Sequence, residues 1–180
     1  MSMPVGVVNV SEKWDGRQLT DEAYERAVAE VRELIASFGD PAGLKPLFES
    51  GSAHFLGTSG TVTSIAGVHL QLPRYRRDRV DGLWLTMETV EKITQYLHKM
   101  SLEERANEPC IGPERADLVV SGCIILDALV REWPVDRVRV ADRGLREGLL
   151  VEIATGAKQQ RRKKRRSRKK KRPAAKTDQS

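Results

Sequence analysis

The sequence predicts an α/β layer fold, and two observations support that prediction. Short runs of β-branched and apolar residues alternate with longer segments in which apolar residues recur at helical spacing. The longer expected elements follow the order β-α-β-α-α-α-β-α, with one short helix in addition at 101–108, and this order is typical of helices packed on a sheet. A chain of 180 residues with 39% hydrophobic residues is long enough to bury the core of one ordinary domain.

The first part of the chain is expected to hold two strands and two helices. A run of valines at 5–10 predicts a strand, because β-branched residues favour extended backbone. Capping chemistry and early acidic residues open a helix at 20–38, which a Gly-Asp-Pro sequence ends. An apolar run at 53–56 predicts the second strand, and the segment 57–70 turns from it into an amphipathic helix.

The rest of the chain is expected to hold four helices and one strand. Thr86 is a helix cap, and Ser101 and Glu104 have the spacing of a capping box. Pro113 is expected near the first turn of a helix, where proline is tolerated. The expected helices span 86–100, 101–108, 113–133 and 145–154, and the strand spans 137–141.

The turn between the second strand and its helix is the most informative stretch. Backbone N–H groups of a first helical turn have no intrahelical partner, and the helix dipole favours negative charge there. Glycine lets the backbone approach a ligand closely. The pattern indicates a phosphate or nucleotide site, and a plain helix N-cap is the alternative. The residues concerned are Gly57, Thr58, Ser59, Gly60 and Thr61.

Four strings in this order carry a family resemblance. They are Gly-Thr-Ser-Gly-Thr at 57–61, Arg-Val-Asp-Gly-Leu-Trp-Leu at 79–85, Pro-Cys-Ile-Gly-Pro-Glu-Arg-Ala-Asp-Leu at 109–118, and Val-Ala-Asp-Arg-Gly-Leu-Arg-Glu-Gly-Leu-Leu at 140–150. In order and spacing they resemble the exopolyphosphatase / guanosine pentaphosphate phosphohydrolase (Ppx/GppA) family. The resemblance runs from about residue 4 to residue 153 and covers only the second half of that family's catalytic unit.

The resemblance implies a fold of the actin-like ATPase superfamily, in which two ribonuclease-H-like domains face each other across a cleft. Residues 1–156 would form the second domain, incomplete at its N-terminus, and 157–180 a disordered Lys/Arg-rich tail. The family's Asp-x-Gly-Ser loop, catalytic glutamate and Gly-Gly-Gly-Ser loop have no counterpart here, since the sequence has no Gly-Gly pair. We therefore expect an N-terminally truncated chain without a catalytic residue of its own.

The same resemblance implies the activity of the complete protein. It would hydrolyse terminal phosphoanhydride bonds of inorganic polyphosphate or of guanosine penta- or tetraphosphate, and the choice between these substrates stays open. Mg²⁺ would offset phosphate charge, with its ligands and the general base mostly outside this chain. The chain by itself is expected to be inactive.

Several residues are candidates for the cleft. The family motif places Arg115 where a guanidinium could pair with phosphate, and a salt bridge to Glu114 or Asp117 is the structural alternative. For the remaining candidates, a turn or an ion pair is favoured over a direct role. These residues, assigned to cleft support, are Asp81, Arg146 and Glu147.

Charge divides the chain in two. Residues 1–157 hold 18 Lys/Arg and 24 Asp/Glu, a net charge of −6, whereas residues 158–180 hold 13 Lys/Arg and one Asp, a net charge of +12. A cationic run without aromatic residues binds polyanions, including nucleic acid or polyphosphate, by charge alone; a solvated tail is the alternative. The residues assigned to this contact are Arg161, Arg162, Lys163, Lys164, Arg165 and Arg166.

The cysteines and histidines carry no recognisable motif. Cys110 and Cys123 are too far apart for a C-x-x-C pair, and the three histidines share no metal spacing. With no signal peptide and no apolar run of about 20 residues, the sequence predicts a cytoplasmic protein without a membrane span. A non-catalytic polyanion-binding module, a subunit that complements a separately encoded first half, and a homodimer remain open.

Overall fold

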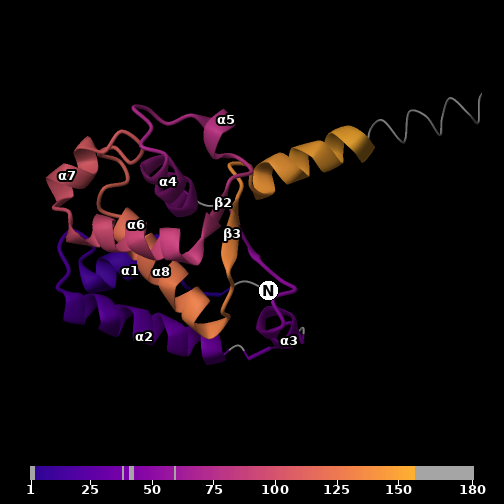
Figure 1. Ribbon diagram of the computed structural model, residues 1–180, viewed down its shortest axis with the longest axis horizontal. Helices are drawn as coiled ribbons and strands as arrows, with labels where there is room; N and C mark the ends of the chain where they lie inside the picture. The colour runs from indigo at the N-terminus through magenta and orange to yellow at the C-terminus, as the bar shows by residue number, and fades with distance from the viewer. Residues whose placement is uncertain (1–2, 38, 41–42, 59, 157–180) are drawn as a thin grey trace, which may run out of the picture. The chain divides into compact units, whose positions relative to one another are not determined.

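The computed structural model describes residues 3–37, 39–40, 43–58 and 60–156. The chain divides into two compact units, 1–142 and 143–180, and each is described by itself. In the first unit, helices pack against one small sheet (Figure 1). Its helices are α1 (Val7–Trp14), α2 (Asp21–Ser37), α3 (Lys45–Glu49), α4 (Gly60–His69), α5 (Arg77–Val80), α6 (Met87–Lys99), α7 (Leu102–Asn107) and α8 (Val119–Glu132), and its strands are β1 (Phe55–Gly57), β2 (Trp84–Thr86) and β3 (Arg137–Val140).

The three strands are ordered β1-β3-β2. β1 runs parallel to β3, with Leu56 opposite Arg139, and β2 runs antiparallel to β3, with Trp84 opposite the same Arg139. Side chains alternate between the two faces of a strand. Leu85 and Val138 are at most 1% exposed and face the helices. Leu56, on the opposite face, is 60% exposed, so the helices of this unit cover one face of the sheet.

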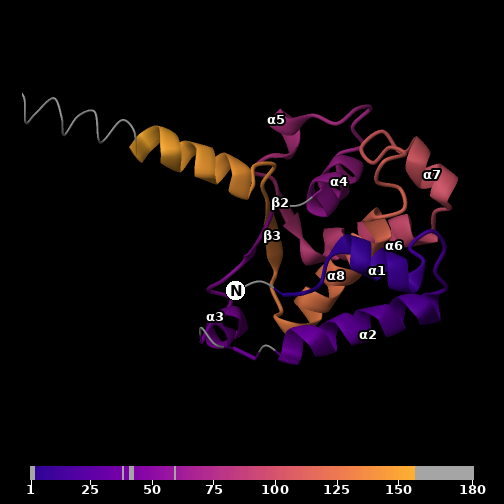
Figure 2. The same cartoon turned by 180° about the vertical axis from the view of Figure 1, so that it is seen from behind.

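Helix α8 lies at the centre of the first unit. It packs against α1, α2, α4 and α6, as Figures 1 and 2 show from two sides. Its buried residues face several directions, which is typical of a helix surrounded by protein. At Gly122 a Cβ would lie 2.0 Å from the Thr61 Oγ1, so only glycine lets the start of α4 approach α8 this closely.

Most predicted elements are confirmed. Thr86 caps α6 by accepting the Thr89 N–H at 3.2 Å, and Ser101 and Glu104 form the capping box of α7. The predicted helices at 20–38 and 57–70 and the strands at 53–56 and 137–141 appear as α2, α4, β1 and β3. Each of these elements follows from capping, turn or periodicity signals within a few residues.

The strand predicted at 5–10 is wrong, because the chain enters helix α1 at Val7 and no strand forms in the described residues before it. Gly6 is the extended N-cap, with φ −147°, and the helix runs from Val7 to Trp14. Val10 is buried and Val8 is 52% exposed, so one helical face packs inward. The β preference of valine is weak, and packing against α8 overrides it. No edge strand therefore forms here.

The helix predicted at 113–133 begins later than expected. Residues 113–118 form turns, and α8 starts at Val119, although Ala116 within these turns is buried. Strand β2 and the short helices α3 and α5 were not predicted. They contain three to five residues each, too few to show a period in the sequence.

The second unit contains the last predicted helix. Residues 145–156 are helical, and its apolar residues Leu145, Leu150 and Ile153 are more than 60% exposed. The predicted tail, with its cationic residues at 161–166, lies outside the described residues. In the described part of the chain, no helix combines the length and apolar character needed to cross a bilayer.

Candidate phosphate-binding site

The turn from β1 into α4 is tight and is anchored to the sheet. The Gly57 carbonyl accepts the Ala141 N–H at 2.8 Å, which ties the end of β1 to the end of β3. A Cβ on Gly57 would lie 2.6 Å from a methyl carbon of Val62, so the turn requires glycine there. Helix α4 consequently starts at the carboxyl ends of two parallel strands, where α/β sheets commonly bind ligands.

The hydroxyl groups of this segment fall into two groups. Thr63 and Ser64 donate to the carbonyls of Gly60 and Cys110, at 3.0 and 3.1 Å, so these hydroxyls serve the fold. Thr58 is exposed and Thr61 is half-buried at the start of α4. Ser59 lies outside the described residues. The candidate ligand contacts are therefore the N-terminus of α4 and Thr61, because Thr61 lines the pocket at this turn and Thr58 does not.

The structure brings Arg115 to this turn. A pocket of about 200 Å³ is lined by Gly60, Thr61 and Arg115, with Val7, Ser64, Leu118 and Val119 completing it. A Cβ on Gly60 would lie 3.5 Å from the Arg115 Nη1, so the guanidinium lies directly beside the helix N-terminus. Two sources of positive potential meet here, which suits a bound anion.

The sequence predicted that Arg115 lies in the first turn of a helix, but the structure does not place it in a helix. It lies in the turns before α8, where its N–H donates to the Gly112 carbonyl at 3.2 Å and its own carbonyl accepts the Val119 N–H at 2.9 Å. Its side chain is exposed. Within the described residues no ion pair joins Arg115 to Glu114 or Asp117, so the guanidinium keeps its capacity for a ligand.

Asp81 organises the turn that leads into β2. Its carboxylate accepts the Asp142 N–H at 3.0 Å, and the following Gly82 has φ +83°, a backbone conformation that glycine adopts without strain. The Gly82 N–H donates to the Val140 carbonyl at 2.8 Å. The structure thus gives Asp81 the turn-forming role that sequence reasoning favoured.

Asp142 is an acidic residue that sequence reasoning did not single out. Its carboxylate accepts the Tyr75 hydroxyl at 2.8 Å and contacts the Arg77 guanidinium. Burial opposes ionisation, but these two partners, together with the charge of Arg115, lower the pKa of Asp142. Burial and the bond to Asp142 raise the pKa of Tyr75 to about 12. Asp142 is therefore ionised at neutral pH and acts electrostatically on Arg115.

Arg146 and Glu147 lie on helix 145–156 of the second unit. The Glu147 carboxylate accepts the Gly144 N–H at 2.9 Å and so caps the start of its own helix. Arg146 is exposed. Their position relative to the Arg115 pocket is not described, and their assignment to the cleft stays a prediction.

The lining of this pocket offers groups that suit an anion but no general base. Its lining offers N–H, hydroxyl and guanidinium donors and no carboxylate. In the described part of the chain, no group of three or more His, Cys, Asp or Glu residues lies close enough together to hold a metal ion. Burial raises the pKa of both Cys110 and Cys123, which keeps the thiols protonated and unreactive.

Comparisons with known proteins find relatives over most of this chain. The chain is 26% identical over 153 residues to Exopolyphosphatase 1 of Mycobacterium tuberculosis (strain ATCC 25618 / H37Rv), which covers 84% of this chain and 43% of the relative. It is also 26% identical over 152 residues to Exopolyphosphatase 1 of Mycobacterium leprae (strain TN), with the same coverage. The chain therefore spans less than half the length of these relatives.

Solved structures show the same fold. A Ppx/GppA phosphatase of Aquifex aeolicus superposes with a TM-score of 0.72 at 25% identity, covering 84% of this chain and 48% of that one. An exopolyphosphatase of Cytophaga hutchinsonii superposes with a TM-score of 0.68 at 16% identity, covering 87% and 49%. The α/β fold class is confirmed by these neighbours. A model of the Ppx/GppA phosphatase family matches residues 1–156, and the chain belongs to that family.

Proposed function

We propose that this chain supplies one wall of the catalytic cleft of an exopolyphosphatase or guanosine pentaphosphate phosphohydrolase. The observation that supports the proposal is the position of the Arg115 guanidinium beside the N-terminus of α4 in one pocket. Both groups attract the oxygens of a terminal phosphate, and no side chain of the described residues neutralises Arg115 by an ion pair. The second-domain assignment of residues 1–156 is part of this proposal.

The reaction is attack of water on the terminal phosphorus with cleavage of the P–O bond to the next phosphate. The chain's own residues contribute binding and charge: first-turn N–H groups of α4 hold the phosphate oxygens, and Arg115 stabilises the charge that develops on them. The negative charge of Asp142 lies near Arg115. Mg²⁺ and the base that activates water are expected on a part of the enzyme outside this chain. The chain alone is proposed to be inactive.

Binding of inorganic tripolyphosphate to the full chain tests the proposal. Titration calorimetry in about 0.3 M salt suppresses charge-only binding by the tail. Arg115→Ala should weaken binding about tenfold, because hydrogen bonds to charged groups contribute roughly 1.5–3 kcal/mol. Arg74→Ala, which removes an equally exposed arginine outside the pocket, is the matched control. Equal affinities of the wild type and Arg115→Ala would refute the site.

A non-catalytic polyanion-binding module is the second candidate function. The net charge of +12 over residues 158–180 favours it, since such a run binds nucleic acid or polyphosphate without reading sequence. If the chain is instead one subunit of an enzyme whose first half is separately encoded, mixing the two should release phosphate. Binding of polyanions without phosphate release, both by the chain alone and after mixing with a first half, would support the binding module. We expect a cytoplasmic location and leave a homodimer as a further possibility for either candidate.

A further inference from the structure

The face of the sheet that points away from the helices of the first unit carries a row of basic, aromatic and apolar side chains. The strand register places Leu56, Arg139 and Trp84 side by side across β1, β3 and β2. Arg137 lies two residues before Arg139 on β3, so its side chain is on the same face. Leu56 and Arg137 are exposed, and Arg139 and Trp84 are half-buried. None of these four residues lines the Arg115 pocket.

The indole of Trp84 orders the two arginines of this row. The guanidinium carbon of Arg137 lies 4.4 Å from the centroid of the Trp84 ring, and that of Arg139 lies 5.0 Å from it. The ring of His54 meets the same indole edge-on, with centroids 4.7 Å apart. A cation–π contact holds a guanidinium without neutralising it, because the ring carries no net charge. The sheet face therefore presents two ordered positive charges.

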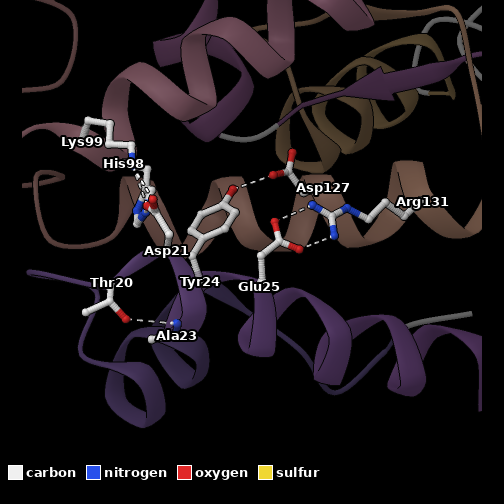
Figure 3. A network of polar contacts seen from close by, with 9 residues as sticks. All are labelled: Thr20, Asp21, Ala23, Tyr24, Glu25, His98, Lys99, Asp127 and Arg131. Carbon is white, nitrogen blue, oxygen red and sulfur yellow. Dashed lines mark hydrogen bonds and ion pairs between the residues drawn. The ribbon is translucent and has the colours of Figure 1, made fainter.

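These two arginines differ from the cations between α2 and α8. There, Arg131 binds the Glu25 carboxylate through two hydrogen bonds of 2.6 and 2.9 Å (Figure 3). In the part of the chain that the structure describes, neither Arg137 nor Arg139 forms an ion pair. No carboxylate of these residues therefore competes with an anionic ligand for the two guanidinium groups.

The chemistry of this face matches a single-stranded nucleic acid. The phosphates of such a strand pair with guanidinium groups, and its bases stack on aromatic rings and on the planes of arginine side chains. Leu56, which is 60% exposed beside Arg139, adds apolar surface for a base or a sugar. Inorganic polyphosphate would use the two cations and leave the indole and the leucine without a contact.

We infer that this sheet face binds single-stranded nucleic acid, with phosphates at Arg137 and Arg139 and a base against Trp84. Residues 158–180, with a net charge of +12, add attraction that does not depend on the base sequence. The sheet face is separate from the Arg115 pocket, so the inference does not depend on the phosphohydrolase proposal.

Fluorescence polarisation of a labelled oligothymidylate of 12 nucleotides tests the stacking contact. The full chain is titrated in about 0.3 M salt, which weakens the contribution of residues 158–180. Trp84→Leu keeps an apolar side chain and removes the ring. It should weaken oligothymidylate binding about fivefold, the loss expected for one stacked base. Binding of polyphosphate of similar length should change less than about twofold.

The same assay tests the two arginines. The double variant Arg137→Gln, Arg139→Gln should weaken oligothymidylate binding about tenfold and reduce the slope of log affinity against log salt by about 1.4, which is about 0.7 for each lost phosphate contact. Arg26→Gln is the matched control, because Arg26 is an exposed arginine on α2 whose guanidinium carbon lies 6.0 Å from the Trp14 ring centroid. It should bind as the wild type does.

Photocrosslinking locates the bound strand. An oligothymidylate that contains 4-thiothymidine, irradiated with the full chain and digested with trypsin, should label the peptide 80–92, which contains Trp84.

Three outcomes would overturn the inference. The first is wild-type affinity in both the Trp84 and the arginine variants, which is also the result if another segment of the chain or a second copy occupies the face. The second is an equal loss of polyphosphate binding in Trp84→Leu, which would indicate a general polyanion site. The third is crosslinking confined to residues 158–180. A thermal melt distinguishes unfolding of Trp84→Leu from loss of binding, and the arginine variant and the crosslink test the face in either case.

Discussion

Replacing Gly122 by alanine tests how the start of α4 is held against α8. The new Cβ would lie 2.0 Å from the Thr61 Oγ1 and 2.8 Å from its Cβ. Rotating the Thr61 side chain cannot relieve the second contact, because the Cβ position is fixed by the backbone. The two helices must therefore separate or shift.

The expected loss of stability in Gly122→Ala is the balance of two opposing contributions. Overpacking in a tight contact costs up to about 3 kcal/mol. Alanine gains about 1 kcal/mol over glycine within a helix. The net loss is about 2 kcal/mol, which lowers the melting temperature of a chain of this size by roughly 4–8 °C.

Thermal unfolding followed by circular dichroism measures this loss. Gly148→Ala is the matched control, because Gly148 lies in helix 145–156 with nothing within 4 Å of a new Cβ; its melting temperature should equal or exceed that of the wild type. Adding Thr61→Ala to Gly122→Ala removes two of the three clashing atoms and should recover part of the loss. A Gly122→Ala protein that melts within about 1 °C of the wild type would refute this packing.

Three further predictions concern α1, Asp142 and the tail. Val8→Ala should leave stability unchanged or raise it by about 0.5 kcal/mol, because Val8 is exposed on a helix and alanine favours helices; a clear loss in a denaturant melt would instead support a strand. Asp142→Asn should lower the melting temperature at pH 7. The lowered pKa of Asp142 means that its stabilisation is present above the unfolded pKa of about 4 and is lost as pH falls through the folded value. The difference between variant and wild type should shrink on acidification, and a difference independent of pH would contradict the ion pair. Deleting residues 158–180 should weaken binding of long polyphosphate strongly at low salt and little at high salt, as measured by filter binding; equal losses at both salt concentrations would argue against counterion release.

The sequence correctly predicted features that depend on residues close together in the chain. The caps at Thr86 and at Ser101–Glu104 depend on residues three positions apart, and the structure forms both. The turn at 57–61 follows from glycine and hydroxyl chemistry in the same way. Elements that depend on distant partners were harder to predict. The valines at 5–10 are typical of a strand when the sequence is taken alone. The chain from Val7 onward forms a helix because it packs against α8.

In the candidate site, too, some residues could be identified from the sequence and others only from the structure. The sequence identified the α4 turn and Arg115 separately, and the family resemblance connected them. It did not show that Tyr75 and Arg77 hold Asp142. Such groupings join side chains from several elements, and no spacing along one segment encodes them.

The sequence by itself determined the α/β class, the tight turn before α4 and the separation of an acidic body from a basic end. These properties depend on composition and on contacts between near neighbours in the chain. The tertiary structure alone decided that Arg115 lies beside Gly60 and that Thr61 packs against Gly122. Both arrangements arise because helices remote in sequence pack on α8, and that packing minimises exposed apolar surface over the whole unit rather than over any segment.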